Sequence, residues 1–272
     1  MARKKTAGKS VLHRAKSRLA AVGEKVAPGI TIGKVLPSLI TLCSTMCGMS
    51  AILWASRGYF GRAVLLIMLA AILDALDGGV ARLLKASSQF GVELDSLSDA
   101  ISFGVAPAFV MYYFSAHHVK AFGWLASVML AVACVLRLAR FNIMTGDRKT
   151  PEYWKKFFVG TPAPMGGLMA MYPITLFFAT GEELFMSPQV GIAFLVACAL
   201  LMISRIPTIA LKKVRLPGPL VPYVLVALTF TLALMFYHFW RVLAAIGIVY
   251  ALSIPLSILL FLRARRQART AQ

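Results

Sequence analysis

Residues 74–100 read DALDGGVARLLKASSQFGVELDSLSDA and place four aspartates and an arginine in a chain that is otherwise strongly apolar. Of its 272 residues, 59% are hydrophobic and 14% charged, and the mean hydropathy is +0.77. This composition is typical of a polytopic membrane protein. An ionised aspartate inside a membrane segment is costly unless it is paired or bound to a metal. The four aspartates therefore predict a functional site; the alternative is a polar network that only joins helices.

Eight apolar runs along the chain are about as long as a membrane-crossing helix. Such a helix needs about 20 apolar residues to cross roughly 30 Å of hydrocarbon. The predicted spans cover residues 36–55, 63–82, 95–115, 122–141, 163–180, 187–204, 219–237 and 241–262, with polar, glycine or proline residues between them. We therefore expect an all-α fold, a polytopic helical bundle with eight transmembrane helices.

The basic residues divide unevenly between the loops that this count predicts. With the amino terminus inside the cell, 25 of the 29 Lys and Arg residues fall on the inner side, and only Arg57, Arg62, Lys120 and Arg241 fall outside. Lys and Arg collect in the cytoplasmic loops of membrane proteins. The charges therefore predict cytoplasmic N and C termini, and a multi-pass protein of the inner (cytoplasmic) membrane whose acidic stretch faces the cytoplasm.

Four parts follow from this pattern. They are a basic cytoplasmic segment, a membrane core, two additional transmembrane helices and a basic cytoplasmic tail, at residues 1–34, 35–215, 216–262 and 263–272. In residues 9–22, apolar side chains recur near helical spacing among Arg14, Lys16 and Arg18. That pattern fits an interfacial amphipathic helix as well as it fits a basic tail without structure.

The formal net charge of +19 raises the question of an anionic partner. Because the basic residues are spread over inner loops and both tails instead of lining one groove, the pattern favours anionic membrane lipids over nucleic acid. Ser44 and Gly48 form a small-xxx-small pair of the kind that packs helix dimers, so a homodimer is a further, weaker expectation.

The four aspartates fall at the ends of two neighbouring spans. Asp74 and Asp77 are three residues apart near the inner end of the second span, and Asp95 and Asp99 are four apart at the start of the third. Each pair therefore shares a helix face, and residues 85–91 can form the connection that brings both pairs together. Converging carboxylates repel one another, and hard divalent cations such as magnesium or manganese relieve that repulsion. The spacing predicts a two-metal phosphoryl-transfer site.

The residues between the aspartates suit a nucleotide diphosphate. Gly78 has no side chain beside Asp77 and would let a nucleotide approach the helix closely, and Ala81 keeps the same face shallow. Arg82 can meet a diphosphate with a forked, permanently charged group.

At these positions the chain resembles the CDP-alcohol phosphotransferase family, whose signature is Asp-x2-Asp-Gly-x2-Ala-Arg-x8-Gly-x3-Asp-x3-Asp. All eight fixed positions match, at Asp74, Asp77, Gly78, Ala81, Arg82, Gly91, Asp95 and Asp99. The resemblance implies transfer of a substituted phosphate from a CDP-linked donor to an alcohol, with release of CMP. It implies that Asp74, Asp77 and Asp95 bind the metals, and that Asp99 assists them and deprotonates the attacking hydroxyl. It places Gly78, Ala81, Arg82 and Gly91 in the CDP site.

The flanking sequence resembles bacterial phosphatidylserine synthases of this family. The similar segments are LDSLSDAISFGVAPA from residue 94, LRLARFN at 136–142, GTPAP at 160–164 and SRIPTIALKK at 204–213. The resemblance implies CDP-diacylglycerol as donor and L-serine as acceptor. Two departures concern donor binding, since Pro37-Ser38 replaces a common Pro-Asn and Gly79 replaces a frequent Arg.

A serine acceptor needs a cation for its carboxylate, and the inner end of the fourth span supplies candidates. Arg137 and Arg140 are three residues apart and Asn142 follows, so the two arginines can share a face that points toward the acids. We expect at least one of these arginines to hold the carboxylate, together with Lys212 or Lys213. For the lysines, ordinary positive-inside anchoring fits equally well.

The predicted mechanism is in-line displacement at the lipid-bearing phosphorus, with Arg82 beside the leaving CMP and Asp99 as the base. Other readings stay open at this point. Choline, inositol or glycerol 3-phosphate could replace serine as the acceptor. A membrane prenyltransferase also uses aspartate-rich helices and magnesium, although the spacing fits CDP chemistry better. An ion transporter would need acids that continue across the membrane, whereas these four cluster at one face.

Overall fold

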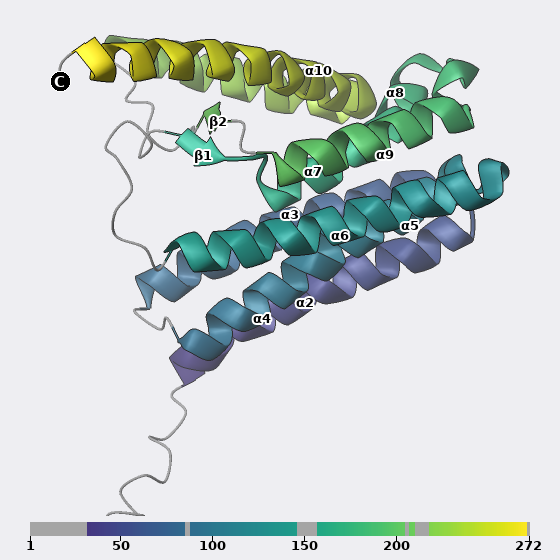
Figure 1. Cartoon of the computed structure of the whole chain (residues 1–272), viewed down its shortest axis with the longest axis horizontal. Coiled ribbons are helices and arrows are strands. Elements are labelled where there is room, and N and C mark those ends of the chain that lie inside the picture. Colours follow the sequence, from purple (N-terminus) through teal and green to yellow (C-terminus); the bar gives the residue numbers. More distant parts are fainter. Residues whose placement is uncertain (1–31, 85–87, 146–156, 205–206, 210–217, 271–272) are drawn as a thin grey trace, which may run out of the picture.

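The computed structural model describes residues 32–84, 88–145, 157–204, 207–209 and 218–270, and it is a bundle of long, roughly parallel helices (Figure 1). The predicted amphipathic segment at residues 9–22 lies outside the described residues. The division of the chain into four parts stays a prediction.

The first half of the chain forms one layer of the bundle. Its helices are α2 (Ile32–Ser56), α3 (Phe60–Leu83), α4 (Gln89–Asp99), the π-helical segment η1 (Ala100–Val105), α5 (Ala106–Phe114), the short η2 (Ala116–Val119) and α6 (Lys120–Thr145). Helices α4, η1 and α5 follow one another without a break and together form the predicted third span. Helices α2 and α3 pack along each other and give the bundle its most extensive helix pair.

The second half of the chain covers this layer on one side (Figure 1). Its elements are β1 (Phe157–Val159), α7 (Ala163–Ala170), α8 (Tyr172–Thr180), η4 (Glu183–Met186), α9 (Pro188–Ile203), β2 (Pro207–Ile209), η6 (Gly218–Leu220) and α10 (Val221–Thr270). The strands β1 and β2 pair antiparallel, with Phe158 opposite Thr208, and form a small sheet in the loops that precede α7 and follow α9. The sequence did not indicate this sheet.

The predicted fifth span is bent. Helices α7 and α8 meet at Met171 at an angle of 48°, and Pro173 lies in the first turn of α8. A proline has no backbone N–H and its ring collides with the carbonyl of the preceding turn, so a straight helix cannot continue through it. The bend therefore follows from Pro173.

Helix α10 contains both of the last two predicted spans. His238 has non-helical backbone angles (φ −133°, ψ 47°) and separates residues 221–237 from the remainder of the helix. Figure 1 shows α10 doubling back at this point, which is where the sequence placed a break between residues 237 and 241.

Within the described residues, five helices are long and apolar enough to cross a membrane, or six if the bent pair α7–α8 counts as one span. Helix α9 is apolar but has only 16 residues. The helical membrane architecture is confirmed, whereas the count of eight spans and the cytoplasmic position of both termini stay predictions.

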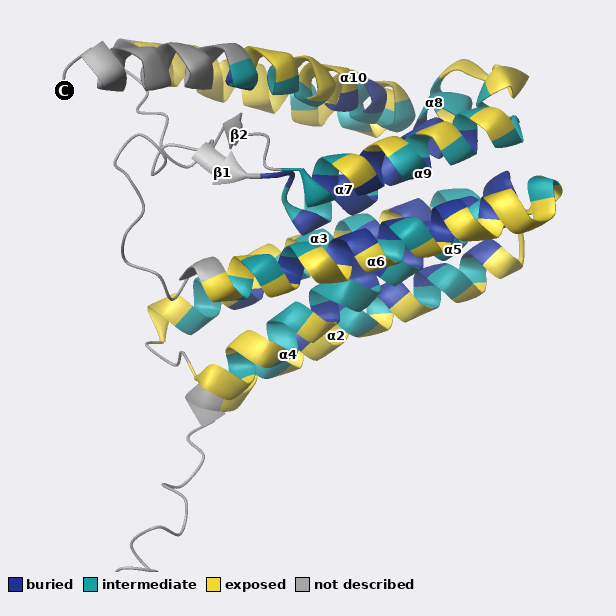
Figure 2. Ribbon diagram, in the orientation of Figure 1, coloured by how far each residue is buried: buried dark blue, intermediate teal, exposed yellow. Residues whose placement is uncertain are grey.

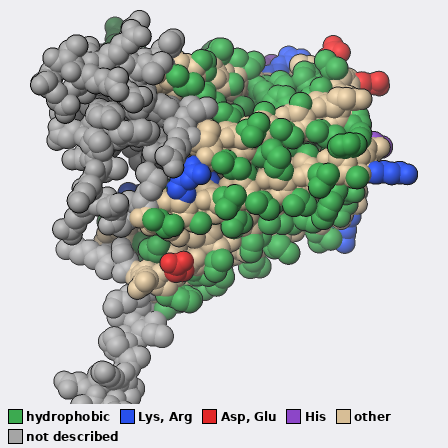
Figure 3. Space-filling view, viewed as in Figure 1, with side chains coloured by type: hydrophobic (Ala, Val, Ile, Leu, Met, Phe, Trp, Pro, Cys, Tyr) green, Lys and Arg blue, Asp and Glu red, His purple; other side chains and the backbone are tan. Residues whose placement is uncertain are grey.

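Burial follows the pattern of a protein that is surrounded by lipid. Buried residues lie between the helices, and exposed ones line their outer faces (Figure 2). Large apolar side chains such as Leu69, Val132 and Phe230 are exposed. In lipid such a surface has no penalty, because the acyl chains are as apolar as the side chains. Figure 3 shows hydrophobic side chains over the flank of the bundle and charged side chains near its ends.

Small residues let the π-helical segment η1 press against α2. A Cβ atom added at Gly48 would lie 2.9 Å from the Cα atom of Ser102, so only glycine fits this contact. Ser102 Oγ donates a hydrogen bond of 3.2 Å to the Ser44 carbonyl, and Ser44 Oγ donates one of 3.0 Å to Ala70 on α3. Ser44 and Gly48 therefore pack inside the chain and do not form the expected dimer face.

Candidate functional site

The aspartates converge at one end of the bundle, where α3 ends and α4 begins. The chain reverses between these two helices, so Asp74 and Asp77 on α3 come to lie beside Asp95 and Asp99 on α4. One carboxylate oxygen each of Asp74, Asp95 and Asp99 lies within 4.8 Å of the others. The predicted convergence is confirmed for these three residues, which are partly buried.

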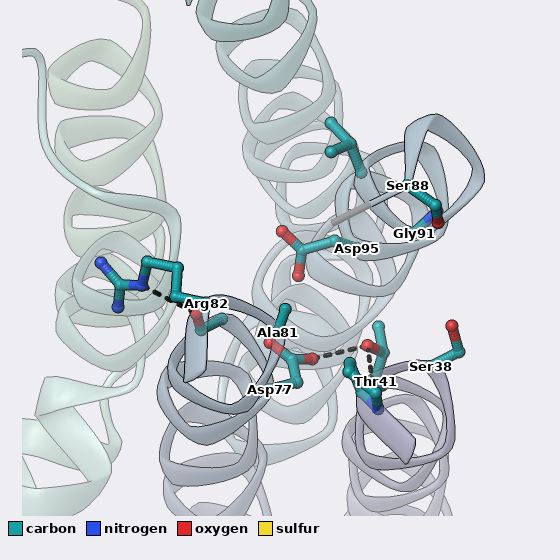
Figure 4. A pocket seen from close by; sticks show the side chains of 11 residues that line it. Ser38, Thr41, Asp77, Ala81, Arg82, Ser88, Gly91 and Asp95 are labelled. Atoms are coloured by element: carbon teal, nitrogen blue, oxygen red, sulfur yellow. Dashed lines mark hydrogen bonds between the residues drawn. The ribbon is translucent and has the colours of Figure 1, made fainter. Parts of the chain in front are cut away.

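The fourth aspartate, Asp77, lies beside this group and faces a cleft (Figure 4). It is only 5% exposed. Its Oδ2 atom accepts a hydrogen bond of 2.6 Å from Thr41 Oγ1, a side chain on the facing helix α2. Thr41 Oγ1 also lies 3.0 Å from the carbonyl oxygen of Pro37, one helical turn earlier. Sequence reasoning missed Thr41, because a lone threonine in an apolar helix gives no signal of its partner.

The three converging carboxylates have the chemistry of a divalent-cation site. All of their donors are hard oxygen atoms, which magnesium and manganese prefer over softer ligands. Their separation of at most 4.8 Å is short enough for one or two ions to contact all three groups. Asp95 also interacts electrostatically with Asp77, so the fourth carboxylate belongs to the same charged region. The residues present therefore fit the metals that the family resemblance implies.

A cleft of about 190 Å³ opens next to the acids, between the ends of α2, α3 and α4. Its lining contains all four residues that the resemblance placed in the CDP site, and the full set is Pro37, Ser38, Thr41, Asp77, Gly78, Ala81, Arg82, Ser88, Gly91, Val92 and Asp95. A Cβ atom added at Gly78 would meet no other atom within 4 Å, so the helix surface there is open to a ligand. Figure 4 shows the cleft between Asp95, Asp77 and Ser38.

Arg82 lines this cleft, but its guanidinium points away from Asp77 and Asp95 in Figure 4. Its Nε atom donates a hydrogen bond of 2.9 Å to the carbonyl of Gly78 on the same helix. The side chain is exposed. A change of rotamer between staggered wells would turn it toward a bound diphosphate.

Gly91 lies inside α4 and not in the predicted connection of residues 85–91. The helix begins at Gln89, because Ser88 caps it and its Oγ atom accepts a hydrogen bond of 3.0 Å from the Gly91 backbone N–H. Serine is a strong N-cap residue. A Cβ atom at Gly91 would lie 3.2 Å from Ser88 Oγ, so a side chain there would crowd the cap at the edge of the cleft.

A network of hydroxyl groups ties the end of α4 to α2. Ser98 Oγ donates to the Thr41 carbonyl at 3.1 Å, and Thr45 Oγ1 donates to Ser98 Oγ at 2.8 Å. The π-helical turn η1 starts directly after Asp99. Turns of this kind are rare in proteins overall, but where they occur they often lie at functional sites. Sequence reasoning missed η1, since the apolar run that follows Asp99 reads as an ordinary helix.

The three predicted acceptor residues lie in different surroundings. Arg137 lies close enough to Asp99 for their charges to interact electrostatically. Arg140 Nη1 donates a hydrogen bond of 2.7 Å to the Ile203 carbonyl and ties α6 to α9. Asn142 Nδ2 donates to Ser96 Oγ at 3.0 Å. The structure therefore brings Arg137 to the acids and gives the other two side chains partners within the bundle. Lys212 and Lys213 lie outside the described residues.

Comparisons with known proteins agree with this site. Residues 34–210 match the family model described as CDP-alcohol phosphatidyltransferase. A CDP-diacylglycerol–serine O-phosphatidyltransferase of Mycobacterium leprae is 40% identical over 184 residues, which are 68% of this chain and 61% of that protein. One of Mycobacterium bovis is 36% identical over 225 residues, 83% of this chain and 78% of that protein.

An archaeal protein shows the same similarity. The archaetidylserine synthase of Methanothermobacter thermautotrophicus is 36% identical over 179 residues, which are 65% of this chain and 70% of that protein. The family match covers the whole acidic signature and the helices that build the cleft. The chain is therefore a member of the CDP-alcohol phosphatidyltransferase family.

Proposed function

We propose that this chain transfers the phosphatidyl group of CDP-diacylglycerol to the hydroxyl of L-serine, which gives phosphatidylserine and CMP. The observation that most strongly supports this proposal is the acid cluster of Asp74, Asp95 and Asp99 beside a cleft that all four signature residues of the CDP site line. Serine as the acceptor is supported by the names of the relatives in Mycobacterium.

The cleft and a neighbouring groove suit the two halves of the donor. CDP would occupy the cleft, where Gly78 leaves room and Arg82 can reach the diphosphate. An apolar groove of about 360 Å³ lies beside the acids, lined by Met68, Ala71, Ile72, Ala75, Leu76 and Leu168. Five of these residues lie on one face of α3, within two helical turns of Asp74 along the chain. This groove supports binding of a lipid chain whose phosphate reaches the acid cluster.

The acids would hold two divalent ions, magnesium or manganese, with Asp74, Asp77 and Asp95 as the main ligands and Asp99 assisting. When bound, the ions supply positive charge that neutralises the diphosphate and the charge that develops during transfer. The chain's own residues position these groups. Thr41 fixes the carboxylate of Asp77 through its hydrogen bond of 2.6 Å, and the cap at Ser88 fixes the start of the helix that presents Asp95 and Asp99.

Asp99 is the proposed general base. Its position at the junction of α4 and η1 sets it beside Asp74 and within electrostatic reach of Arg137. It would take the proton of the serine hydroxyl as the serine oxygen forms a bond to the phosphorus that bears the lipid. The bond from that phosphorus to the bridging oxygen breaks, and CMP leaves with the electron pair beside Arg82.

Arg137 is the proposed ligand of the serine carboxylate. Its charge interacts with that of Asp99, whereas the side chains of Arg140 and Asn142 bind other groups of the bundle. A guanidinium binds a carboxylate through two parallel N–H···O bonds. The acceptor would therefore lie between Arg137 and Asp99, with its hydroxyl at the base and its carboxylate at the arginine.

The end of the bundle that holds the acids is the end that the charge distribution predicts to face the cytoplasm. We propose that the protein lies in the inner membrane with the site open to the cytoplasm, where serine enters and CMP leaves in water. Anionic lipids would contact the basic inner loops.

Purified protein should release CMP from CDP-diacylglycerol in the presence of manganese or magnesium when serine is added, and should form phosphatidylserine. Serine, inositol, choline and glycerol 3-phosphate should be offered separately, with a chelator as the control. Release with a different acceptor would support the proposed metal and CDP sites and contradict the proposed serine site. No release with any acceptor, from folded protein, would contradict the proposed function.

Asp99→Asn should lower turnover by about 10²–10⁴-fold, because the amide cannot take the serine proton. The change keeps an oxygen for the metals, so binding of CDP-diacylglycerol should persist. Glu93→Gln is the matched control, since Glu93 is an exposed carboxylate on the same helix. Steady-state CMP release and donor binding are the measurements. Near-normal turnover of Asp99→Asn would contradict the role of Asp99 as the general base.

Arg137→Gln should raise the Michaelis constant for serine about tenfold, because a charge-assisted hydrogen-bonded pair is lost. Arg140→Gln should leave that constant within about twofold, since the Arg140 side chain binds the Ile203 carbonyl instead. Initial rates over a serine titration at saturating donor separate the two variants. Equal effects of both substitutions, or none, would rule out Arg137 as the carboxylate ligand.

A further inference from the structure

Helix α10 lies outside the part of the chain that matches the family, residues 34–210, yet it packs against elements of that part. It contacts α8 and β2, and Tyr172 donates a hydrogen bond to the Ala244 carbonyl on α10. Its later half also contributes Tyr250 to the interior of the bundle. Helix α10 is thus in a position to act on the site as well as to anchor the chain.

Tyr250 borders a cavity of about 110 Å³ between α7, α9 and α10. Apolar side chains form most of its wall, and Thr161, at the loop before α7, is the other hydroxyl-bearing residue there. The Tyr250 hydroxyl oxygen is buried. Thr161 lies close enough to interact with it, but no hydrogen bond of good geometry joins it to another atom of the described residues. A buried hydroxyl group that lacks a good hydrogen bond is costly, so we expect Tyr250 to have a hydrogen-bond partner nearby.

The complementary group is Arg137. Its Nε atom is likewise buried and has no hydrogen-bond partner among the described residues. The guanidinium interacts electrostatically with Tyr250 on one side and with Asp99 on the other. An arginine N–H is a donor only, and a tyrosine oxygen accepts. The two buried atoms are thus a donor and an acceptor whose side chains interact electrostatically, and no hydrogen bond joins them in this structure.

We propose that Tyr250 is a positioning residue: when the acceptor binds, its hydroxyl oxygen accepts a hydrogen bond from Arg137 Nε, and this bond aims the guanidinium at the acceptor. The pairing would leave the two terminal nitrogens of Arg137 in one plane, ready for the fork that binds a carboxylate. This inference rests on the proposed function, because it assigns Tyr250 to the same acceptor site. It makes α10 a determinant of selectivity for acceptors that bear a carboxylate.

Tyr250→Phe tests the proposal with little change of volume. The Michaelis constant for serine should rise by about three- to tenfold, while turnover at saturating serine and the constant for CDP-diacylglycerol stay within about twofold. Tyr223→Phe is the matched control, because Tyr223 lies on the same helix and is 73% exposed. A purely structural role would instead change turnover and both constants together.

A double-mutant cycle shows whether Tyr250 affects serine binding through Arg137 or independently of it. If Tyr250 acts by orienting Arg137, then Tyr250→Phe should add little to the effect of Arg137→Gln, and the two changes should be non-additive. Size-exclusion profiles and melting temperatures show that each variant is folded.

The outcomes distinguish this inference from the proposed function. Transfer to serine by the wild type, a raised serine constant in Arg137→Gln and an unchanged one in Tyr250→Phe would overturn the role of Tyr250 alone. Additive effects in the cycle would also overturn it. If the wild type transferred the phosphatidyl group to no acceptor, both the proposed function and the role of Tyr250 would be contradicted.

Discussion

The mutual repulsion of carboxylates in an apolar bundle is the constraint on which the rest of this structure depends. Oxygens of Asp74, Asp95 and Asp99 approach within 4.8 Å, in a part of the chain where lipid surrounds the outer helix faces. Such a group is unfavourable unless positive charge compensates it. Divalent ions and the Arg137 guanidinium are the charges that the surroundings can supply, and a diphosphate donor brings further ligands for the ions.

Rigid packing around the acids keeps them in place. Helix α2 has no acidic residue, but it fixes Asp77 through Thr41 and the start of the third span through Ser98. The contact of Gly48 with Ser102 presses the π-helical turn against α2 immediately after Asp99. A metal site needs its ligands held by neighbouring groups, because loosely placed carboxylates bind weakly. The hydroxyl network and the small residues supply that support.

The sequence predicted the helical membrane fold and the pairing of the two acidic helix ends, because both rest on spacing within a helix. The family resemblance supplied the four residues that line the cleft beside the acids. It did not predict Thr41, the π-helical turn or the β1–β2 pair, since these depend on contacts between distant segments. It assigned Ser44 and Gly48 to a dimer face, whereas they pack within the chain, because a small-residue stripe does not reveal which helix it meets. It grouped Arg137 with Arg140 by helix periodicity, and only the structure separates the arginine near Asp99 from the one that binds the Ile203 carbonyl.

The most direct test of this account is to count the manganese ions that the purified protein binds, by electron paramagnetic resonance in the presence of CDP. We expect two ions per chain in the wild type and clearly weaker binding in Asp95→Asn, with Glu93→Gln, two residues away on the exposed side of α4, unchanged. Equal manganese binding by wild type and Asp95→Asn, or none by folded wild type, would contradict the claim that the carboxylate cluster is a metal site.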